Sequence, residues 1–331
     1  MMEDEKTTQA CSLWRALDVI GDVPTILILE SAFLRITRFD GFLTSTGILR
    51  TLLSNRLKTL CDAKCMEKVA YSEKPRRYEY RLTEKGRDIY GAALMMLRWE
   101  QKWGRQSGKI EVHMRHKTCG EICIPTPSCG SCHEEVDARA VRWQEGPGFT
   151  KIQIDYHRRR RQSGSTRKRQ NETTLFDTIS AVIGDRWSML VLRAVFTSIT
   201  TFDEIRKDSG IATNILAGRL KTLTSMGILE KQAYQHKPTR YRYKLTESGR
   251  DIYPIQLEIL KWGDRHYANK EGPPLLLFHK NCDKELNPKI CCNMCGAPLV
   301  PEEVDFEVTE PGFTESQTYK AEAVFAPELS A

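Results

Sequence analysis

Two histidine and cysteine motifs with the spacing of metal ligands recur in this 331-residue chain. Each reads H-x2-C, then nine residues, then C-x2-C. Three thiolates and one imidazole suit tetrahedral Zn²⁺, and four protein ligands leave no open position for a reactive water. We therefore predict structural zinc sites. The ligands are His116, Cys119, Cys129 and Cys132 in the first motif and His279, Cys282, Cys292 and Cys295 in the second.

Other assignments of these cysteines stay open. The histidines are the weakest ligands, and Cys123 or Cys291 could supply the fourth donor instead. Alternatively, the thiols are buried and inert in a small β subdomain. The chain has eleven cysteines and no recognisable export signal, so a disulfide framework is not expected in a reducing compartment.

A separate cysteine, Cys11, lies near the start of the first predicted helix. Helix N-termini favour reactive thiolates, which makes Cys11 a redox candidate. The second copy has Thr174 at this place, so any sensing would be one-sided. The alternative is an ordinary thiol without a redox role.

The composition describes a chain that can bury cores and needs no membrane. Its hydrophobic fraction is 40%, and no run of eighteen apolar residues is present. The first residues are acidic and polar, which argues against a signal peptide and favours a cytoplasmic protein. The net charge is +7, but residues 156–173 alone carry +6, so the rest is nearly neutral. Nucleic-acid binding would therefore depend on local patches.

The chain is a tandem duplication with an offset of 163 residues. Between residues 54 and 90, 22 of 37 positions are identical to those 163 residues later, and the cysteine motifs keep the same offset. Each copy is long enough to fold as a domain. The segment between the copies, 156–173, is polar and rich in arginine, so we predict a disordered linker. Its arginines could clamp phosphates or form only a solvated tether.

The helices that must support these sites are clearest in the second copy. Apolar residues at helical spacing predict a first helix that ends at Gly184, and Asp185 can cap the next one. A short third helix opens near Thr201, and a turn follows at Gly210. The apolar stripe after this turn predicts a fourth helix, which ends at Gly227.

A basic β-hairpin follows the fourth helix. The strands LEKQAY and RYRYKLT flank a turn, and Thr246 can cap a last helix. Because strand side chains alternate, Tyr241, Tyr243 and Leu245 should pack inward while cations between them face outward. These cations are spaced like phosphate contacts. Alternatively, they are only the wet face of a half-buried strand.

Helices, a short turn, a helix with a polar face and a basic hairpin form the layout of a winged helix-turn-helix. The series IGDRW, LVLR, TFDEIR, RLKTL, GILE and KPTRYRYKLTESGRDIYPI resembles the HxlR-type winged-helix transcriptional regulators of bacteria, over nearly all of both copies. The resemblance implies a DNA-binding regulator whose dimer uses the first and last helices of each winged domain. Two copies in one chain then imply an intramolecular pseudo-dimer, which could assemble further into a homo-oligomer. In some such regulators a cysteine at the place of Cys11 senses electrophiles or oxidants.

The expected contacts with double-stranded DNA lie on the outer faces of the fourth helices, which would enter the major groove, and on the hairpins. In the first copy they are Arg50, Thr51, Ser54, Asn55 and Lys58 on the helix and Arg77 and Arg81 on the hairpin. In the second copy they are Thr213, Asn214, Gly218 and Lys221 on the helix and Lys237, Arg240, Arg242 and Lys244 on the hairpin.

The two copies are unequal at these places. Glu79 stands where the second copy has Arg242, and a carboxylate that faces phosphate weakens binding. Lys64 stands where the second copy has Gly227, and a left-handed lysine costs about 1 kcal/mol. We therefore expect an asymmetric operator or a dominant second copy.

Together these patterns predict an α+β fold with two winged helix-turn-helix domains, each followed by a small cysteine-rich, zinc-ribbon-like β subdomain. The predicted ranges are winged domains at 1–105 and 174–269, cysteine-rich segments at 106–155 and 270–313, the linker at 156–173 and a disordered tail at 314–331. The favoured function is sequence-specific transcription regulation by the pseudo-dimer. The alternative is an interaction or effector-sensing module in which copy 1 serves dimerisation and only copy 2 binds DNA. No nucleophile–base pair, phosphate loop or open metal site is recognisable, so no enzyme activity is expected.

Overall fold

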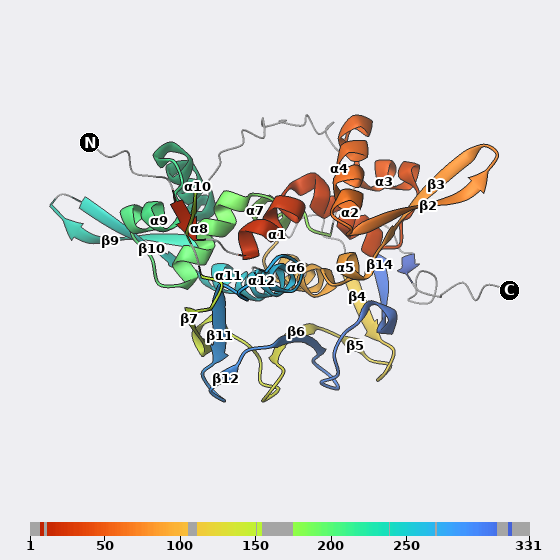
Figure 1. Ribbon diagram of the computed structural model, residues 1–331. Coiled ribbons are helices and arrows are strands. Elements are labelled where there is room, and N and C mark those ends of the chain that lie inside the picture. Colours follow the sequence, from red (N-terminus) through yellow and green to blue (C-terminus); the bar gives the residue numbers. More distant parts are fainter. Residues whose placement is uncertain are drawn as a thin grey trace. The chain divides into compact units, whose positions relative to one another are not determined.

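The structure is a computed structural model of the chain, shown in Figure 1. It describes residues 7–9, 12–104, 111–149, 151–153, 175–237, 239–268, 270–309 and 317–319. The redox candidate Cys11, its counterpart Thr174 and the predicted linker 156–173 lie outside these ranges. In the described ranges helices and strands are mixed, and no helix there is long and apolar enough to cross a membrane.

The first copy contains a helix-turn-helix followed by a hairpin. Its first four helices are α1 (Ser12–Ile20), α2 (Val23–Phe33), α3 (Phe39–Thr46) and α4 (Arg50–Asp62). Gly47 turns the chain between α3 and α4 with a φ of 60°, a conformation that favours glycine. The hairpin and the closing helices are β2 (Met66–Glu73), β3 (Arg76–Leu82), α5 (Glu84–Arg87) and α6 (Tyr90–Trp103).

The second copy repeats this order. Its elements are α7 (Ile179–Ile183), α8 (Arg186–Phe196), α9 (Phe202–Ser209), α10 (Thr213–Ser225), β9 (Leu229–His236), β10 (Thr239–Leu245), α11 (Glu247–Arg250) and α12 (Tyr253–Tyr267). Asp185 caps α8 as predicted, because its carboxylate accepts a hydrogen bond from the Trp187 N–H at 3.0 Å. Thr201 opens α9, where its N–H donates to the Glu204 carboxylate at 3.1 Å.

The helices α4 and α10 are held by one buried leucine stripe each. Leu53, Leu57 and Leu60 are fully buried on α4, and Leu216, Leu220 and Leu223 take the same places on α10. This spacing follows the helical period, so the opposite faces remain available to a partner. The predicted left-handed ends are confirmed: φ is 58° at Lys64 and 70° at Gly227.

Two details of the second copy differ from the expectations. The predicted last helix is divided into two helices, α11 and α12. Thr246 caps the short helix α11, where its side chain accepts a hydrogen bond from the Gly249 N–H at 3.1 Å. Gly249 is required there, since a Cβ atom would collide with the backbone carbonyl of Ile228. The inward packing expected for Tyr241 is wrong: its side chain is 38% exposed, whereas Tyr243 is 9% exposed. The hairpin extends beyond the body that would have covered Tyr241.

Short strands follow each winged domain. Those of the first copy are β4 (Glu111–His116), β5 (Ile122–Cys123), β6 (Pro125–Cys129), β7 (Val141–Glu145) and β8 (Lys151–Gln153), with the 3₁₀ turn Ala138–Ala140 before β7. Those of the second copy are β11 (Leu275–His279), β12 (Lys284–Glu285), β13 (Pro288–Cys292), β14 (Val304–Thr309) and β15 (Gln317–Tyr319), with the 3₁₀ turn Pro301–Glu303 before β14. The strand β1 (Thr7–Gln9) pairs with β8. Strand β15 lies within the predicted tail 314–331, whose other residues are outside the described ranges.

Some of these strands pair within one copy, such as β4 with β5 and β11 with β12, but the main pairings join the two copies. Strand β7 of the first copy pairs antiparallel with β11 of the second, with Trp143 opposite Leu277. Strand β4 of the first copy likewise pairs with β14 of the second, with Met114 opposite Phe306. Each cysteine-rich sheet is therefore made by both copies.

The structure contains two compact units, and neither unit corresponds to one repeat. Each unit combines segments from both copies, so the units alternate along the sequence. Unit 1 contains the described parts of Met1–Asp22, Cys129–Gln162 and Ala181–Pro288. Unit 2 contains those of Val23–Ser128, Ser163–Ser180 and Lys289–Ala331. The predicted domain ranges follow one another along the chain, so they do not describe these units.

Helix packing inside each unit also joins segments of different copies. In unit 1, α1 of the first copy packs on α12 of the second so closely that a Cβ at Gly263 would lie 2.5 Å from the Ser12 carbonyl oxygen. In unit 2, the start of the second copy lies on helices of the first. There the buried Glu30 carboxylate accepts a hydrogen bond from the Leu175 N–H at 2.8 Å, and Glu100 accepts one from the Ile179 N–H at 2.8 Å.

Candidate DNA-binding surfaces and metal centres

The outer faces of α4 and α10 carry every helix residue that the sequence predicted to contact DNA. All of these side chains are exposed, and they occupy equivalent places in the two copies. Gly218 lies in the open part of the α10 face, because a Cβ added there would have no neighbour within 4 Å. Arg50 at the start of α4 makes an ion pair with Asp40 at 3.2 Å, and both side chains remain largely exposed. Such a surface pair is weak enough to give way to a phosphate or base contact.

The second hairpin presents its predicted cations to solvent. Lys237, Arg240, Arg242 and Lys244 are all exposed. Exposed tyrosines on the hairpin support cations, since the Lys231 ammonium lies 3.7 Å from the Tyr241 ring centre and the Arg242 guanidinium 5.1 Å from that of Tyr234. The tyrosine expected in the core thus contributes to the outer surface of the hairpin.

The first hairpin has a different electrostatic arrangement. Glu79 is only 14% exposed, and its carboxylate lies 2.6 Å from the Arg81 guanidinium. Glu79 therefore does more than replace Arg242, because it also neutralises the neighbouring predicted contact Arg81. Arg77 remains exposed.

Arg76 of the first hairpin is exposed and was not among the predicted contacts, and the same holds for Lys68 and Lys74. Arg76 lies beside the turn, with its guanidinium 5.4 Å from the ring centre of Tyr78, and the second copy has Thr239 at this place. Strand alternation places Arg76 on the same side as Tyr78, whereas the predicted contacts Arg77 and Arg81 lie on the other side. Arg76 pairs with Glu73 next to the hairpin turn. Its position beside a turn was the sequence signal that could have predicted an exposed side chain.

The eight predicted metal ligands form two groups of four. Within each group the nitrogen and sulfur ligand atoms all lie within 4.8 Å of one another. The groups, however, are not the two sequence motifs. One combines His116 and Cys119 with Cys292 and Cys295, and the other combines His279 and Cys282 with Cys129 and Cys132. The prediction of one ligand set per motif is therefore wrong, because the H-x2-C of each copy meets the C-x2-C of the other.

The distances in the first group, all inside unit 2, fit a tetrahedral metal centre. The His116 Nδ1 atom lies 3.5 Å from the Cys119 sulfur and 3.3 Å from the Cys295 sulfur. The sulfurs of Cys119 and Cys292 are 3.9 Å apart. A tetrahedral Zn²⁺ with ordinary bond lengths requires about 3.6 Å for such N···S edges and about 3.8 Å for S···S edges.

The second group, all inside unit 1, repeats this geometry. The His279 Nδ1 atom lies 3.2 Å from the Cys132 sulfur and 3.6 Å from the Cys282 sulfur, and the sulfurs of Cys129 and Cys282 are 3.9 Å apart. Burial opposes ionisation of Cys129, but N–H groups of Ser131 and Cys132 outweigh it and lower the pKa of this thiol. A lowered pKa favours the thiolate that a metal requires.

Tight turns aim the ligands in both groups. The Ser131 N–H donates to the Cys129 sulfur at 3.5 Å, and the Met294 N–H donates to the Cys292 sulfur at 3.4 Å. The residue after each ligand pair has a positive φ, which reverses the chain beside the ligands. These residues are Gly120, His133, Asp283 and Gly296. Four equivalent turns of this kind make both ligand groups preorganised.

The alternative fourth ligands do not join either group. Cys123 and Cys291 are buried outside both sets among the described residues, and burial raises the pKa of Cys123 to about 12. Both histidines are fully buried, and their Nε2 atoms have no hydrogen-bond partner among the described residues. In each group the histidine Nδ1 atom is therefore the candidate for the fourth donor. The groups can hold a metal ion, and all four positions of a tetrahedral ion would be filled by protein.

Comparisons with known proteins match the winged parts of both copies. Residues 19–108 and 182–271 each match the HxlR-like helix-turn-helix family. The uncharacterized HTH-type transcriptional regulator Rv3095 of Mycobacterium tuberculosis (strain ATCC 25618 / H37Rv) is 40% identical over 138 residues, which are 42% of this chain and 87% of that protein. The uncharacterized HTH-type transcriptional regulator YdeP of Bacillus subtilis (strain 168) is 29% identical over 91 residues, which are 27% of this chain and 71% of that protein.

Solved structures with a detectable likeness include PA1607, described as a proposed transcription factor. It is 31% identical, covers 37% of this chain and 86% of its own, and has a TM-score of 0.34. The matches to the curated relatives cover most of each relative but less than half of this chain, which agrees with a duplicated chain. With both winged copies matched, the chain belongs to the HxlR-like helix-turn-helix family of DNA-binding transcription regulators.

Proposed function

We propose that this transcription regulator binds a specific DNA site as a single-chain pseudo-dimer, with α4 and α10 in successive major grooves and the hairpins along the phosphates. The observation that carries the proposal is the exposed polar face on both α4 and α10. Recognition helices of this class enter the major groove, and dimers read half-sites about one helical turn apart. Two readers in one polypeptide would remove the concentration dependence of dimer formation.

The packing inside each unit supports the pseudo-dimer. Unit 1 joins α1 of the first copy to α12 of the second, and Arg186 at the start of α8 contacts Asp18 of α1 at 2.8 Å. Trp14 and Trp187 pack between the same helices with ring centres 5.4 Å apart. In a dimer built from first and last helices, the first helix of one copy packs on the last helix of the other. The packing of α1 on α12 has this arrangement.

The proposed contacts divide into base readers and phosphate binders. Arg50 and Asn55 on α4 and Asn214 on α10 have the side chains that pair with guanine or adenine edges. Lys58, Lys221 and the hairpin cations would bind phosphates, which strengthens binding without reading sequence. Because the α4 and α10 faces carry different residues, the two half-sites should differ in sequence.

We also propose that each His/Cys group holds one structural Zn²⁺. The donor set of three sulfurs and one nitrogen suits zinc better than harder cations, and the distances fit its tetrahedral geometry. Each ion would bind ligands from both copies, so its role would be to hold the copies together. No catalytic role is proposed, since no coordination position would remain for water or substrate.

Selection of binding sites from random double-stranded DNA with the full chain tests the proposed function. A specific motif should emerge, and Asn214→Ala should weaken its binding by about tenfold while relaxing the preference at one position. Lys221→Ala should weaken binding to all sequences alike. Lys289 is an exposed cation on β13, outside the proposed contacts, so Lys289→Ala should change neither the affinity nor the sequence preference. Recovery of no motif at moderate salt would refute sequence-specific binding.

A further inference from the structure

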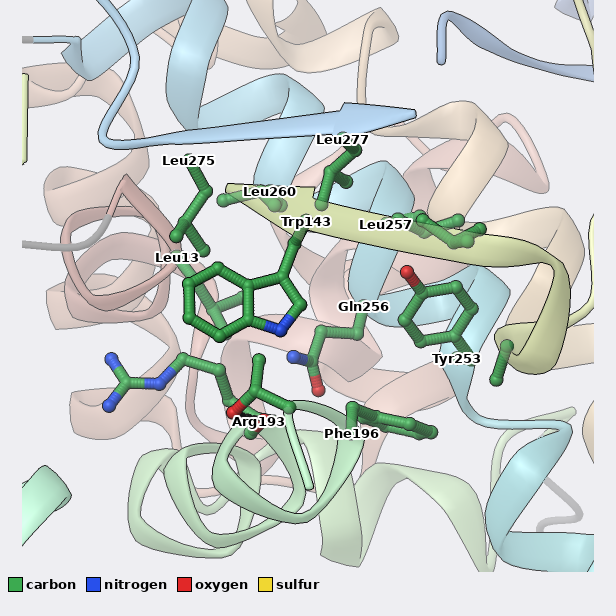
Figure 2. A pocket seen from close by; sticks show the side chains of 13 residues that line it. Leu13, Trp143, Arg193, Phe196, Tyr253, Gln256, Leu257, Leu260, Leu275 and Leu277 are labelled. Carbon is green, nitrogen blue, oxygen red and sulfur yellow. Dashed lines mark hydrogen bonds between the residues drawn. The ribbon is translucent and has the colours of Figure 1, made fainter. Parts of the chain in front are cut away.

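A pocket in unit 1 lies between the winged domain and the cysteine-rich sheet. Helices α1, α8 and α12 form three of its sides, and strands β7 and β11 form the other, as Figure 2 shows. It encloses about 520 Å³ of space, part of which is open to solvent.

The pocket walls are largely apolar and aromatic. Leu13, Leu257, Leu260 and Leu277 supply aliphatic surface, and Trp143, Phe196 and Tyr253 supply rings. The rings of Phe196 and Tyr253 pack together with their centres 4.8 Å apart, while Trp143 is 41% exposed at the opening. Such walls favour a flat, apolar ligand.

The pocket wall contains a buried hydrogen-bond acceptor on Gln256. Gln256 is only 6% exposed, and its Oε1 atom has no hydrogen-bond partner among the described residues. In Figure 2 its amide lies among the side chains of Trp143, Phe196 and Tyr253, inside the pocket lining. An unsatisfied buried acceptor destabilises the protein, so a bound donor would be favoured here.

The charge in the pocket wall is already balanced. Arg193 of α8 is almost fully buried, and its guanidinium lies 2.6 Å from the carboxylate of Asp208 in α9. A charged ligand would add an uncompensated buried charge, which is costly. The pocket therefore suits an uncharged molecule.

Unit 2 contains the equivalent pocket without these features. Ala93 takes the place of Gln256, so the amide is missing, and Phe176 takes the place of Leu13. Glu30 replaces Arg193, and its carboxylate is occupied by the Leu175 N–H at 2.8 Å. The enclosed space is smaller, about 320 Å³. The duplication thus supplies its own control for the role of Gln256.

We propose that the unit 1 pocket binds a small, uncharged aromatic molecule that carries one hydrogen-bond donor, as a phenol does. The rings and leucines cover the apolar part of the ligand, and Gln256 accepts its hydrogen bond. The unit 2 pocket does not bind this class, because Ala93 offers no acceptor and Phe176 occupies more of the space.

Titration of the full chain with p-cresol and with toluene, followed by ligand-observed NMR, tests this site. The two probes differ only by the hydroxyl group, so p-cresol should bind about three- to tenfold more tightly, as expected for one hydrogen bond. Gln256→Ala should remove this difference while leaving toluene binding unchanged. Leu13→Phe should prevent binding of both, and Ala93→Gln in the other unit should change neither.

Both variants in unit 1 copy residues that the chain already tolerates at the equivalent positions of unit 2, which keeps the test independent of misfolding. Melting curves of each variant check this point. Equal binding of p-cresol and toluene to the unaltered chain would overturn the proposal. So would p-cresol binding that survives both Gln256→Ala and Leu13→Phe.

Discussion

The cross-copy ligand groups make a prediction that the order of motifs along the chain would not make. Changing both Cys119 and Cys292 to alanine removes two thiolates from one group and leaves the other intact. Changing both Cys119 and Cys129 removes one thiolate from each group. If the ligands grouped within each sequence motif, the two double variants would exchange their effects.

The expected loss of affinity can be worked from the number of ligands. Structural zinc sites contribute an apparent binding free energy of about 10–16 kcal/mol. Shared equally by four ligands, this is about 2.5–4 kcal/mol per ligand, a weakening of about 10²- to 10³-fold for each thiolate lost. Two thiolates lost from one site weaken it by at least about 10³-fold, whereas one lost from each site weakens both.

Zinc content after dialysis against a chelator that competes at intermediate affinity provides the assay. The Cys119→Ala, Cys292→Ala variant should retain one zinc per chain, and the Cys119→Ala, Cys129→Ala variant should retain none. Cys123→Ala is the matched control, since this buried cysteine lies outside both groups, and it should retain two. The reverse result for the two double variants would refute the cross-copy pairing.

Three further predictions concern stability and DNA affinity. Lys64→Gly should raise the free energy of unfolding by about 1 kcal/mol in urea denaturation, because glycine adopts the φ of 58° without strain; no gain would show that the lysine conformation is unstrained. Burial raises the pKa of Asp264 to about 6, so the folded state holds its proton more tightly than the unfolded state, and stability should fall as pH rises from about 4 to about 6. Asp264→Asn should remove that fall and stabilise the chain at pH 7 by up to about 3 kcal/mol, and an unchanged pH dependence of urea unfolding would contradict this. Glu79→Arg should free Arg81 and add a cation, so the slope of log DNA affinity against log salt concentration should steepen by about 0.9–1.8. Arg242→Glu should flatten this slope by about 0.9. Equal slopes for both variants and the unaltered chain would exclude the hairpins from the DNA contact.

The fold of each copy could be predicted because its signals are local. The leucine stripes of α4 and α10 follow the helical period, and Asp185 and Gly227 act within a single turn of chain. The difference between Lys64 and Gly227 could be predicted for the same reason, since a helix end of this shape requires a left-handed residue whatever its neighbours are.

The exchange between the copies could not be predicted from the same patterns. Both motifs contain an H-x2-C and a C-x2-C, and Cys129 is chemically equivalent to Cys292 as a partner for His116. The choice is made by strand pairing between residues far apart in the chain, such as Trp143 with Leu277. Periodicity carries no information on that choice, because either pairing buries the same faces.

Long-range contacts also decided the side chains that were misjudged. Tyr241 follows the inward alternation, but the hairpin extends past the helices that would cover it. Glu79 was expected to face phosphate, and instead it lies partly buried beside Arg81. Strand alternation predicts on which side of the strand a side chain lies. Whether that side chain is buried depends on which other elements of the fold pack against that side.

A hydroxyl-radical footprint of the full chain on its selected DNA site tests the central claim most directly. The claim predicts that one chain per duplex protects two half-sites about one helical turn apart, with different sequences and unequal protection. Asn55→Ala should then weaken protection of one half-site only, and Asn214→Ala that of the other. Protection of a perfect palindrome by two chains per duplex, with both halves affected alike by either variant, would contradict the claim that a single chain is the pair of readers.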